Sequence, residues 1–315
     1  MADIIISEAV DLEPVERLKP RYGVHYDPEL WRKREELEAV MAEALAIIVR
    51  NATQLDAGVI ARAPRLRVIG RHGVGLDNID VPACEARGIA VCPATGANSA
   101  TVAEWTIAAA LILLRGKGFL STQRVLAGEW PRPELSSGHE AKDKVFGLIG
   151  LGAIGEITAR KARALDFQTI AYSPSLPADH PAWAVAERVS LAELLARADV
   201  VSIHCPLSAK TRGLIGHDAL AAMKSGALLI NSARGGIVDE RALAEALRSG
   251  RLAGAALDVF DTEPIDAATR ALFAGVPNLL LTPHIAASTV ESSRRMCEVT
   301  VENVLRVLDQ RAGRG

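Results

Sequence analysis

One short segment constrains the fold of this chain more than any other, the glycine-rich sequence from Gly150 to Gly155. It reads Gly-Leu-Gly-Ala-Ile-Gly, follows an apolar run at 145–149 and opens an alanine-rich stretch with helical character. Three glycines between a strand and a helix allow a tight turn, a close approach of backbone to phosphate and close packing of the helix on the strand. Because the setting fits as well as the spacing, the segment predicts a strand-turn-helix unit that binds a dinucleotide.

Short β-rich runs alternate with helical patterns along the whole chain, which is typical of α/β folds with parallel sheets. A Pro/Gly/Ser-rich region at 128–138 separates the first long helix from the glycine segment, so we predict two Rossmann-like, doubly wound domains. The predicted strands are 4–6, 46–49, 66–69, 145–149, 169–172, 200–205, 227–231, 253–258 and 279–282, and the long helices are 101–114 and 291–308.

The composition and charge of the chain limit the kinds of partner that it binds. With 315 residues, 49% of them hydrophobic, the chain is long enough for two α/β domains of ordinary size. Its formal net charge of −2 lacks the basic excess that drives binding to nucleic acid or to anionic membranes, so we expect a small-molecule partner, no nucleic acid and no membrane. The N-terminus has neither a basic segment nor a long apolar stretch, so a cytoplasmic location is expected.

The cysteines indicate neither a metal site nor a disulfide framework. They are widely spaced and include no CxxC pair. We therefore expect reduced thiols and no bound metal. The four are Cys84, Cys92, Cys205 and Cys297.

Three chemically active residues, Arg234, Glu263 and His284, follow predicted strands beyond the glycine segment. The carboxyl ends of parallel strands are where ligands bind in such sheets. Histidine exchanges a proton near neutral pH, a carboxylate orients its ring, and arginine offers a planar cation for a carboxylate. Each residue alone is as easily an ordinary surface or strand-end residue. Together with the glycine segment they predict hydride transfer between a nicotinamide and a 2-oxo or 2-hydroxy acid.

The position that discriminates between NAD and NADP carries Ser173. In NAD sites an acidic residue about 20 positions beyond the glycines hydrogen-bonds the ribose 2′-hydroxyl. Here the predicted strand ends in Tyr172, Ser173 and Pro174, so no carboxylate repels a 2′-phosphate and no arginine follows at once to attract one. The sequence leaves NAD and NADP open, and a serine that only ends the strand before a proline turn is an equal alternative.

A glycine-punctuated loop, Arg71 to Asp80, follows an earlier predicted strand. Its spacing predicts that the backbone N–H groups of Val74 and Gly75 form a concave anion site. The alternative is an ordinary strand-to-helix turn capped by Asp77, and both descriptions can hold for one loop.

Five ordered motifs resemble those of the D-isomer-specific 2-hydroxyacid dehydrogenases over essentially the whole chain. They are Gly147 to Gly155, His204-Cys205-Pro206-Leu207 with Thr211, Asn231 to Glu240, Leu257-Asp258-Val259-Phe260, and Pro283-His284-Ile285-Ala286. The resemblance implies a discontinuous, flavodoxin-like substrate domain at 1–98 plus 285–315 and a dinucleotide-binding Rossmann domain at 99–284, with a cleft between them. It also implies a homodimer formed through the cofactor domain, with the segment 115–138 in contact.

The same resemblance implies roles for individual residues. Arg234 orients the substrate, Glu263 partners the histidine, and His284 is the general acid and base. The implied substrate-binding residues are Arg50, Arg71, Gly73, Val74 and Gly75, with Arg234 and His284. The implied residues for NAD or NADP are Gly150, Gly152, Ala153, Ile154, Gly155, Ser173, Cys205, Pro206, Thr211, Ala233, Asp258 and Ala286.

The substrate is expected to carry a second anionic group. The loop around Arg50 resembles the phosphoglycerate dehydrogenase form, in which this arginine meets a second anion, although a solvated surface role for Arg50 is equally open. The segments 124–132 and 138–140 resemble the sulfolactate dehydrogenase branch of the family. We therefore expect a substrate of the sulfolactate or phosphoglycerate type, with glyoxylate or hydroxypyruvate reduction as the alternative. From another functional class, an NAD(H)-sensing binding protein similar to the C-terminal-binding-protein corepressors is less favoured, because the sequence shows no peptide-docking signature.

Overall fold

The computed structural model describes residues 2–312 and divides into two compact units. The first unit runs up to Asn98 and resumes at Ser288, and the second runs from Ser99 to Ala287. The second unit thus ends at Ala287, three residues beyond the boundary at 284 that the sequence predicts. Each unit is built on one parallel β-sheet, so the predicted α/β fold class is confirmed.

The sheet of the first unit has the strand order β2-β1-β3-β4-β5. This is the flavodoxin-like order, in which the chain reverses its winding direction between β1 and β3. Ligands bind at such switch points in open parallel sheets, at the carboxyl ends of the strands. The strands are β1 (Ile4–Ile6), β2 (Val24–Tyr26), β3 (Ala46–Val49), β4 (Val68–Arg71) and β5 (Ala90–Pro93).

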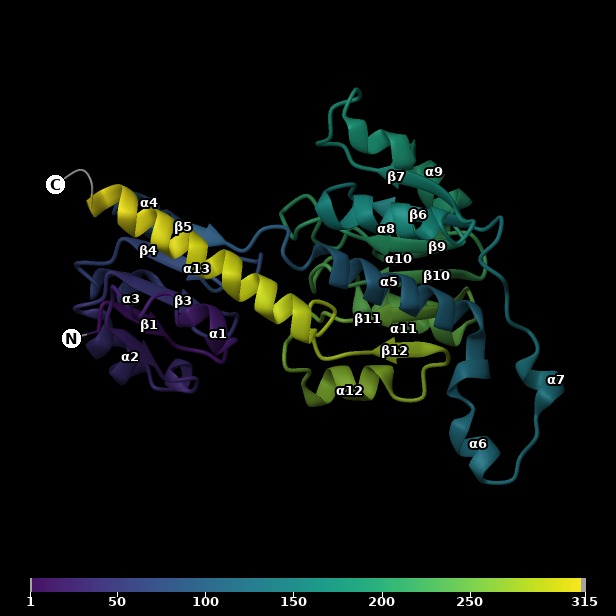
Figure 1. Ribbon diagram of the computed structural model, residues 1–315. Coiled ribbons are helices and arrows are strands. Elements are labelled where there is room, and N and C mark those ends of the chain that lie inside the picture. Colours follow the sequence, from purple (N-terminus) through teal and green to yellow (C-terminus); the bar gives the residue numbers. More distant parts are fainter. Residues whose placement is uncertain (1, 313–315) are drawn as a thin grey trace. The chain divides into compact units, whose positions relative to one another are not determined.

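Helices cover both faces of this first sheet, and alternate strand residues face each layer. Ile5 and Ile47 join the apolar cluster that includes residues of α2 and α3, whereas Ile4 and Ile48 join the cluster that includes α13. The last helix, α13, therefore completes the first unit by packing on β4 and β5 (Figure 1). The helices are α1 (Leu12–Val15), η1 (Leu30–Arg32), α2 (Arg34–Met41), α3 (Ala57–Ala61), α4 (Val81–Ala86) and α13 (Val290–Ala312).

The sheet of the second unit has the order β12-β11-β10-β9-β6-β7-β8. Counted outward from β6, this is the Rossmann order with one additional strand, and the winding reverses between β6 and β9. The strands are β6 (Val145–Ile149), β7 (Gln168–Tyr172), β8 (Glu187–Arg188), β9 (Val200–Ile203), β10 (Ala227–Asn231), β11 (Leu252–Leu257) and β12 (Leu279–Leu281).

Two helical layers enclose this second sheet. On one face α5 packs against α8, β10 and β11, and most of its residues are buried. The other face carries α9, α10 and α11 around a second apolar cluster. Although α5 is strongly apolar, no helix within residues 2–312 combines the length and apolarity that a membrane span needs. The helices are α5 (Ser99–Leu114), α8 (Ala153–Arg163), η3 (Pro181–Val185), α9 (Leu191–Arg197), α10 (His217–Ala222), α11 (Glu240–Arg248) and α12 (Ala267–Phe273).

Between α5 and β6 the chain forms an arm that extends away from the second sheet (Figure 1). The arm comprises η2 (Gly116–Leu120), α6 (Thr122–Leu126) and α7 (Arg132–Leu135). Arg124 pairs with both Glu129 and Glu134 and so ties α6 to α7. Several large apolar side chains of the arm remain exposed: Phe119, Val125, Leu126 and Trp130.

Candidate active site

The glycine turn lies between β6 and α8, at the switch point of the second sheet. Gly150 has φ +101°, and a Cβ at this position would lie 2.8 Å from the His204 carbonyl group. A Cβ on Gly155 would lie 2.3 Å from the Gly150 carbonyl oxygen, so α8 begins directly against the turn. Both positions therefore require glycine, for the reasons that the motif predicts.

The N-terminus of α8 has the open geometry that a pyrophosphate requires. Gly152 is the N-cap residue, no side chain caps the helix there, and a Cβ on Gly152 would meet nothing within 4 Å. Within the described part of the chain, no acceptor takes the N–H groups of Ala153, Ile154 and Gly155. Unsatisfied first-turn N–H groups and the helix dipole attract anions, so these residues fit a dinucleotide phosphate.

Other candidate cofactor residues lie at neighbouring strand ends. Ser173 follows β7 and is largely buried, next to Tyr172, whose carbonyl oxygen accepts the Gly150 N–H at 2.8 Å. Cys205 and Pro206 follow β9, and the backbone of His204 and Cys205 at the end of this strand lies against Gly150. The Thr211 hydroxyl donates to the Pro206 carbonyl oxygen (2.7 Å) and accepts the Ser208 N–H (2.8 Å). These contacts hold the 206–211 turn together.

His204 lies against the glycine turn, and burial keeps its imidazole neutral. Burial lowers the pKa of His204 to about 4, and its Nε2 lies 2.9 Å from the Ser202 hydroxyl. An unfolded chain takes up this proton near pH 6.5. Between about pH 6.5 and 4 the folded state therefore binds fewer protons, so stability falls as the pH falls, by about 1.4 kcal/mol per pH unit for this group.

We expect His204→Asn to flatten this acid dependence. The measurement is the free energy of unfolding by urea at pH 7, 6 and 5, compared between the variant and the wild type. His217→Gln is the matched control, because the His217 side chain is 81% exposed. Equal acid slopes for His204→Asn and the wild type would contradict the assignment.

His284 and Glu263 form a hydrogen-bonded pair after β12 and β11. His284 Nδ1 lies 2.7 Å from Glu263 Oε2, and both side chains are partly exposed. Burial opposes ionisation of Glu263, but hydrogen bonds from His284 and from the Phe260 N–H, with the nearby charges of His284 and Arg234, lower the pKa of the Glu263 carboxyl overall. An ionised Glu263 accepts the Nδ1 proton and leaves Nε2 as the ring nitrogen that exchanges protons.

Asp258 fixes the backbone that carries His284. Its carboxylate, 1% exposed, accepts the Thr282 hydroxyl (2.5 Å) and the N–H groups of Ile285 and Ala286 (both 2.8 Å). The Asp258 carbonyl oxygen also accepts the His284 N–H, and His284 has φ +54°. A left-handed histidine is costly and persists only where its surroundings enforce it. Asp258 and Ala286, to which the family resemblance gives a role in cofactor binding, thus also hold this loop together.

Arg234 follows β10 in a loop closed by Asn231. The Asn231 amide donates to the Arg234 carbonyl oxygen (2.9 Å) and accepts the Ala233 N–H (3.0 Å), while Arg234 Nη1 donates to the Ala233 carbonyl oxygen. The charge of Arg234 acts on Glu263. The structure therefore brings Arg234, Glu263 and His284 together at neighbouring strand ends of the second sheet.

In the first unit, the loop after β4 keeps two backbone donors open. The N–H groups of Val74 and Gly75 donate to none of the residues that the structure describes, and Val74 is exposed. The guanidinium of Arg71 is largely buried, and its Nε donates to the Gly75 carbonyl oxygen at 2.7 Å. Arg71 thus shapes this loop, in which Gly73 has φ +140°.

Arg50 follows β3 at the same sheet edge. Its Nη1 donates to the Ala9 carbonyl oxygen (3.1 Å), and no carboxylate within residues 2–312 pairs with the guanidinium. Burial first, then the charges of Arg50 and Arg71, lower the pKa of His72 to about 4. The imidazole of His72 is neutral near pH 7 and donates through Nε2 to the Ser293 carbonyl oxygen (3.2 Å). Among the described residues, the Arg50 guanidinium therefore has a carbonyl partner but no acidic one.

Sequence reasoning missed Glu8, which lies beside Arg50 and is buried. The available signal was an acidic residue directly after a predicted strand, at the end where ligands bind in parallel sheets.

Comparisons with known proteins agree with this geometry. Residues 107–286 match the NAD-binding domain of the D-isomer-specific 2-hydroxyacid dehydrogenases. The (S)-sulfolactate dehydrogenase of Chromohalobacter salexigens is 50% identical over 313 residues, which are 99% of this chain and 100% of that protein. The D-3-phosphoglycerate dehydrogenase of Archaeoglobus fulgidus is 37% identical over 96% of this chain, which spans only 56% of that relative. The hydroxypyruvate reductase of Thermotoga maritima is 36% identical over 96% of this chain and 97% of its own length.

Solved structures show the same architecture. The TT0316 protein from Thermus thermophilus superposes with a TM-score of 0.88 at 35% identity, over 98% of this chain and 97% of that one. A glyoxylate reductase from Paecilomyes thermophila gives a TM-score of 0.84 at 32% identity, over 96% and 94% of the two chains. The chain therefore belongs to the D-isomer-specific 2-hydroxyacid dehydrogenases, and it is an enzyme of that family with an NAD-binding domain.

Proposed function

We propose that this enzyme interconverts a small 2-oxo acid and its 2-hydroxy acid, and that the substrate carries a second anionic group, as sulfolactate and phosphoglycerate do. The second unit would bind NAD(H), and the first unit would supply contacts to the substrate's anionic groups. The observation that carries the reaction is the His284–Glu263 pair, with Nδ1 and Oε2 2.7 Å apart. The Arg50 guanidinium, which among the described residues bonds the Ala9 carbonyl oxygen and no carboxylate, supports the second anion, as does the similarity to a sulfolactate dehydrogenase.

In this proposal His284 moves the proton. A nicotinamide bound at the glycine turn would supply or accept the hydride at the carbon that bears the oxygen. His284 donates a proton from Nε2 to the carbonyl oxygen during reduction, and takes it back from the hydroxyl during oxidation. Glu263 fixes the ring through Nδ1, so the histidine gives up and takes back its proton at Nε2 without reorienting.

Cationic and backbone donors hold the substrate. Arg234 pairs with the substrate carboxylate and stabilises negative charge that develops on the reacting oxygen. The open N–H groups of Val74 and Gly75 suit a carboxylate oxygen. Arg50 takes the second anionic group, since its guanidinium has donors beyond the one bonded to Ala9.

The test is an initial-rate screen with NADH and with NADPH. The 2-oxo acids are sulfopyruvate, phosphohydroxypyruvate, hydroxypyruvate, glyoxylate and pyruvate. A clear preference for sulfopyruvate or phosphohydroxypyruvate is the expected result. Activity confined to the singly charged acids would replace the proposal with glyoxylate or hydroxypyruvate reduction. An enzyme inactive with all five acids would reject this substrate class.

We propose NAD(H) as the natural cofactor, which the family's NAD-binding domain supports. Ser173→Asp is expected to increase the NADH over NADPH preference by about tenfold, because a carboxylate at the end of β7 repels a 2′-phosphate and accepts a bond from a 2′-hydroxyl. The measurement is kcat/KM for each cofactor. Ser175→Asp, two positions further along, is the control. Unaltered selectivity in Ser173→Asp would place the discriminating contacts elsewhere.

We also propose that the enzyme is a homodimer held through the arm. Leu126 and Trp130, more than three-quarters exposed, give the arm an apolar surface that a second copy of the chain would cover. Sedimentation equilibrium should report a dimer for the wild type and a monomer for Leu126→Asp with Trp130→Asp. Leu12→Asp, at an exposed position of α1, should leave the mass unchanged.

A further inference from the structure

The backbone after β3 converges on a carboxylate supplied by the chain itself. Glu8 Oε1 accepts the N–H groups of Arg50 (2.8 Å) and Thr53 (3.0 Å), and Oε2 accepts the N–H of Ala52 (3.0 Å). The Thr53 hydroxyl donates to Oε1 at 2.7 Å and is the fourth donor to the carboxylate. Glu8 is buried, and its carboxylate therefore occupies a backbone anion site inside the fold.

This site lies at the switch point of the first sheet. Glu8 follows β1 and Arg50 follows β3, and these adjacent parallel strands are the pair between which the winding reverses. The two loops at this edge thus differ in kind. Glu8 accepts the N–H groups of Arg50, Ala52 and Thr53 in the loop after β3, whereas those of Val74 and Gly75 after β4 donate to none of the described residues. In the β3 loop, residues 50–53, the cationic group that an anionic substrate group can bind is the side chain of Arg50.

The carbonyl side of the same loop is fixed as well. The Asn78 amide donates to the carbonyl oxygens of Arg50 (2.9 Å) and Thr53 (2.6 Å). Glu8 and Asn78 together restrain both peptide groups that flank Arg50, and so they set the direction in which its side chain leaves the backbone. The Ala9 carbonyl oxygen, next to Glu8, then receives Arg50 Nη1.

We infer that Glu8 is a positioning residue for substrate recognition, which holds Arg50 where its guanidinium receives the second anionic group of the substrate. This inference rests on the proposed function. A carboxylate is needed because it only accepts hydrogen bonds. A glutamine of the same shape turns one acceptor into a donor that faces N–H groups, and the β3 loop then loses its anchor.

The kinetic test compares sulfopyruvate with pyruvate, which differ by the sulfonate alone. In Glu8→Gln the ratio of kcat/KM for sulfopyruvate to that for pyruvate should fall by about tenfold or more, mainly through a higher KM for sulfopyruvate. A merely structural role would lower both values alike. An unchanged ratio in a folded Glu8→Gln enzyme would overturn the inference.

A double-mutant cycle asks whether Glu8 acts through Arg50. Arg50→Gln should lower the same ratio, and Glu8→Gln combined with Arg50→Gln should lower it no further. Additive losses would show that Glu8 acts independently of Arg50 and would overturn the inference.

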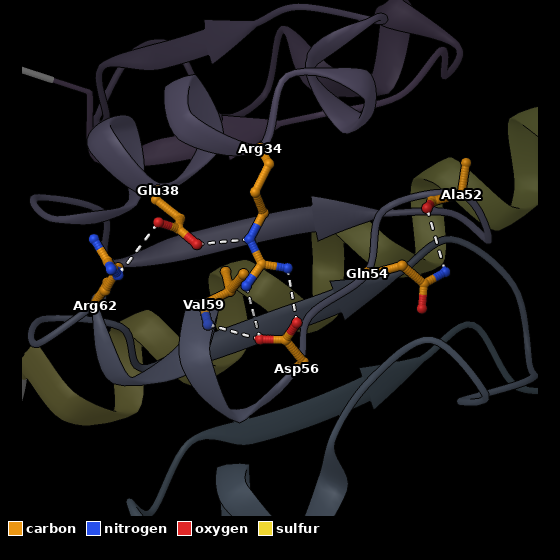
Figure 2. A network of polar contacts seen from close by, with 7 residues as sticks. All are labelled: Arg34, Glu38, Ala52, Gln54, Asp56, Val59 and Arg62. Carbon is orange, nitrogen blue, oxygen red and sulfur yellow. Dashed lines mark hydrogen bonds and ion pairs between the residues drawn. The ribbon is translucent and has the colours of Figure 1, made fainter.

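The control is Asp56→Asn in the segment that follows the β3 loop. Figure 2 shows Arg34 between Glu38 and Asp56, with both Nη atoms on the Asp56 carboxylate (2.7 and 3.0 Å). Asp56 also caps α3 by accepting the Val59 N–H. Loss of the Asp56 carboxylate weakens the local structure but changes no contact of Glu8 or Arg50. The ratio of kcat/KM for sulfopyruvate to that for pyruvate should therefore stay at the wild-type value.

Hydrogen exchange separates this inference from the proposed function. The amides of Arg50, Ala52 and Thr53 should exchange at least about tenfold faster in Glu8→Gln than in the wild type and Asp56→Asn. If the wild type prefers neither sulfopyruvate nor phosphohydroxypyruvate over the singly charged acids, the proposed substrate class fails. Slow exchange in Glu8→Gln would show separately that Glu8 does not anchor the loop. Should Glu8→Gln fail to fold, Thr53→Val removes one donor to Glu8 at nearly constant shape and should shift the ratio and the exchange in the same direction.

Discussion

Replacing His284 with alanine should lower kcat by about 10²–10⁴-fold, the usual contribution of a positioned general acid and base. The imidazole is the only proton carrier in the proposed mechanism, and its Nε2 is the nitrogen left free by the bond to Glu263. Dinucleotide affinity should stay nearly constant, because the glycine turn and the N-terminus of α8 are untouched. Steady-state rates and binding of NADH by fluorescence titration measure the two quantities.

Two further variants sharpen this test. Glu263→Gln keeps a hydrogen-bonding partner for the ring but removes the negative charge beside it, so the pH-rate profile should differ from that of the wild type. His217→Ala, on an exposed helix, should leave kcat unchanged. A His284→Ala enzyme that kept wild-type turnover would end the assignment of this residue.

Arg234→Gln should lower kcat/KM by about 10²–10³-fold, through a lower kcat and a higher KM together. The contact to the substrate carboxylate is lost in the ground state, and the contact to the reacting oxygen is lost where the charge develops. Glutamine keeps much of the length of the side chain, so the loss reports the charge. Arg197→Gln is the matched control, since this exposed arginine pairs with Glu187 on the surface. A wild-type kcat/KM in Arg234→Gln would remove Arg234 from the substrate site.

The central strands of both sheets were predictable because they are buried on both faces and read as short apolar runs. The predicted strands at 4–6, 46–49, 145–149 and 227–231 coincide with β1, β3, β6 and β10. The strands that sequence reasoning missed, β2, β5 and β8, all lie at sheet edges and are incompletely buried. An edge strand packs against one neighbour, so its apolar pattern is weaker.

Strand-end positions also made much of the candidate site predictable, since Arg234, Glu263 and His284 each follow a strand of the second sheet. Their roles stay predictions, but their proximity is a result of the topology. Contacts that depend on backbone direction were not predictable. The left-handed φ of His284 and the three donors on Asp258 arise from a loop whose path no residue pattern specifies.

The return of α13 to the first unit affects how the protein is made on the ribosome. Residues of α13, among them Val301 and Val304, cover the same apolar cluster as Ile4 and Ile48 of the strands at the start of the chain. The second unit is contiguous, so all of it has been synthesised before α13. One face of the first unit's sheet stays uncovered until α13 has been synthesised. Synthesis of the chain from its N-terminus thus favours folding of the second unit before folding of the first unit is complete.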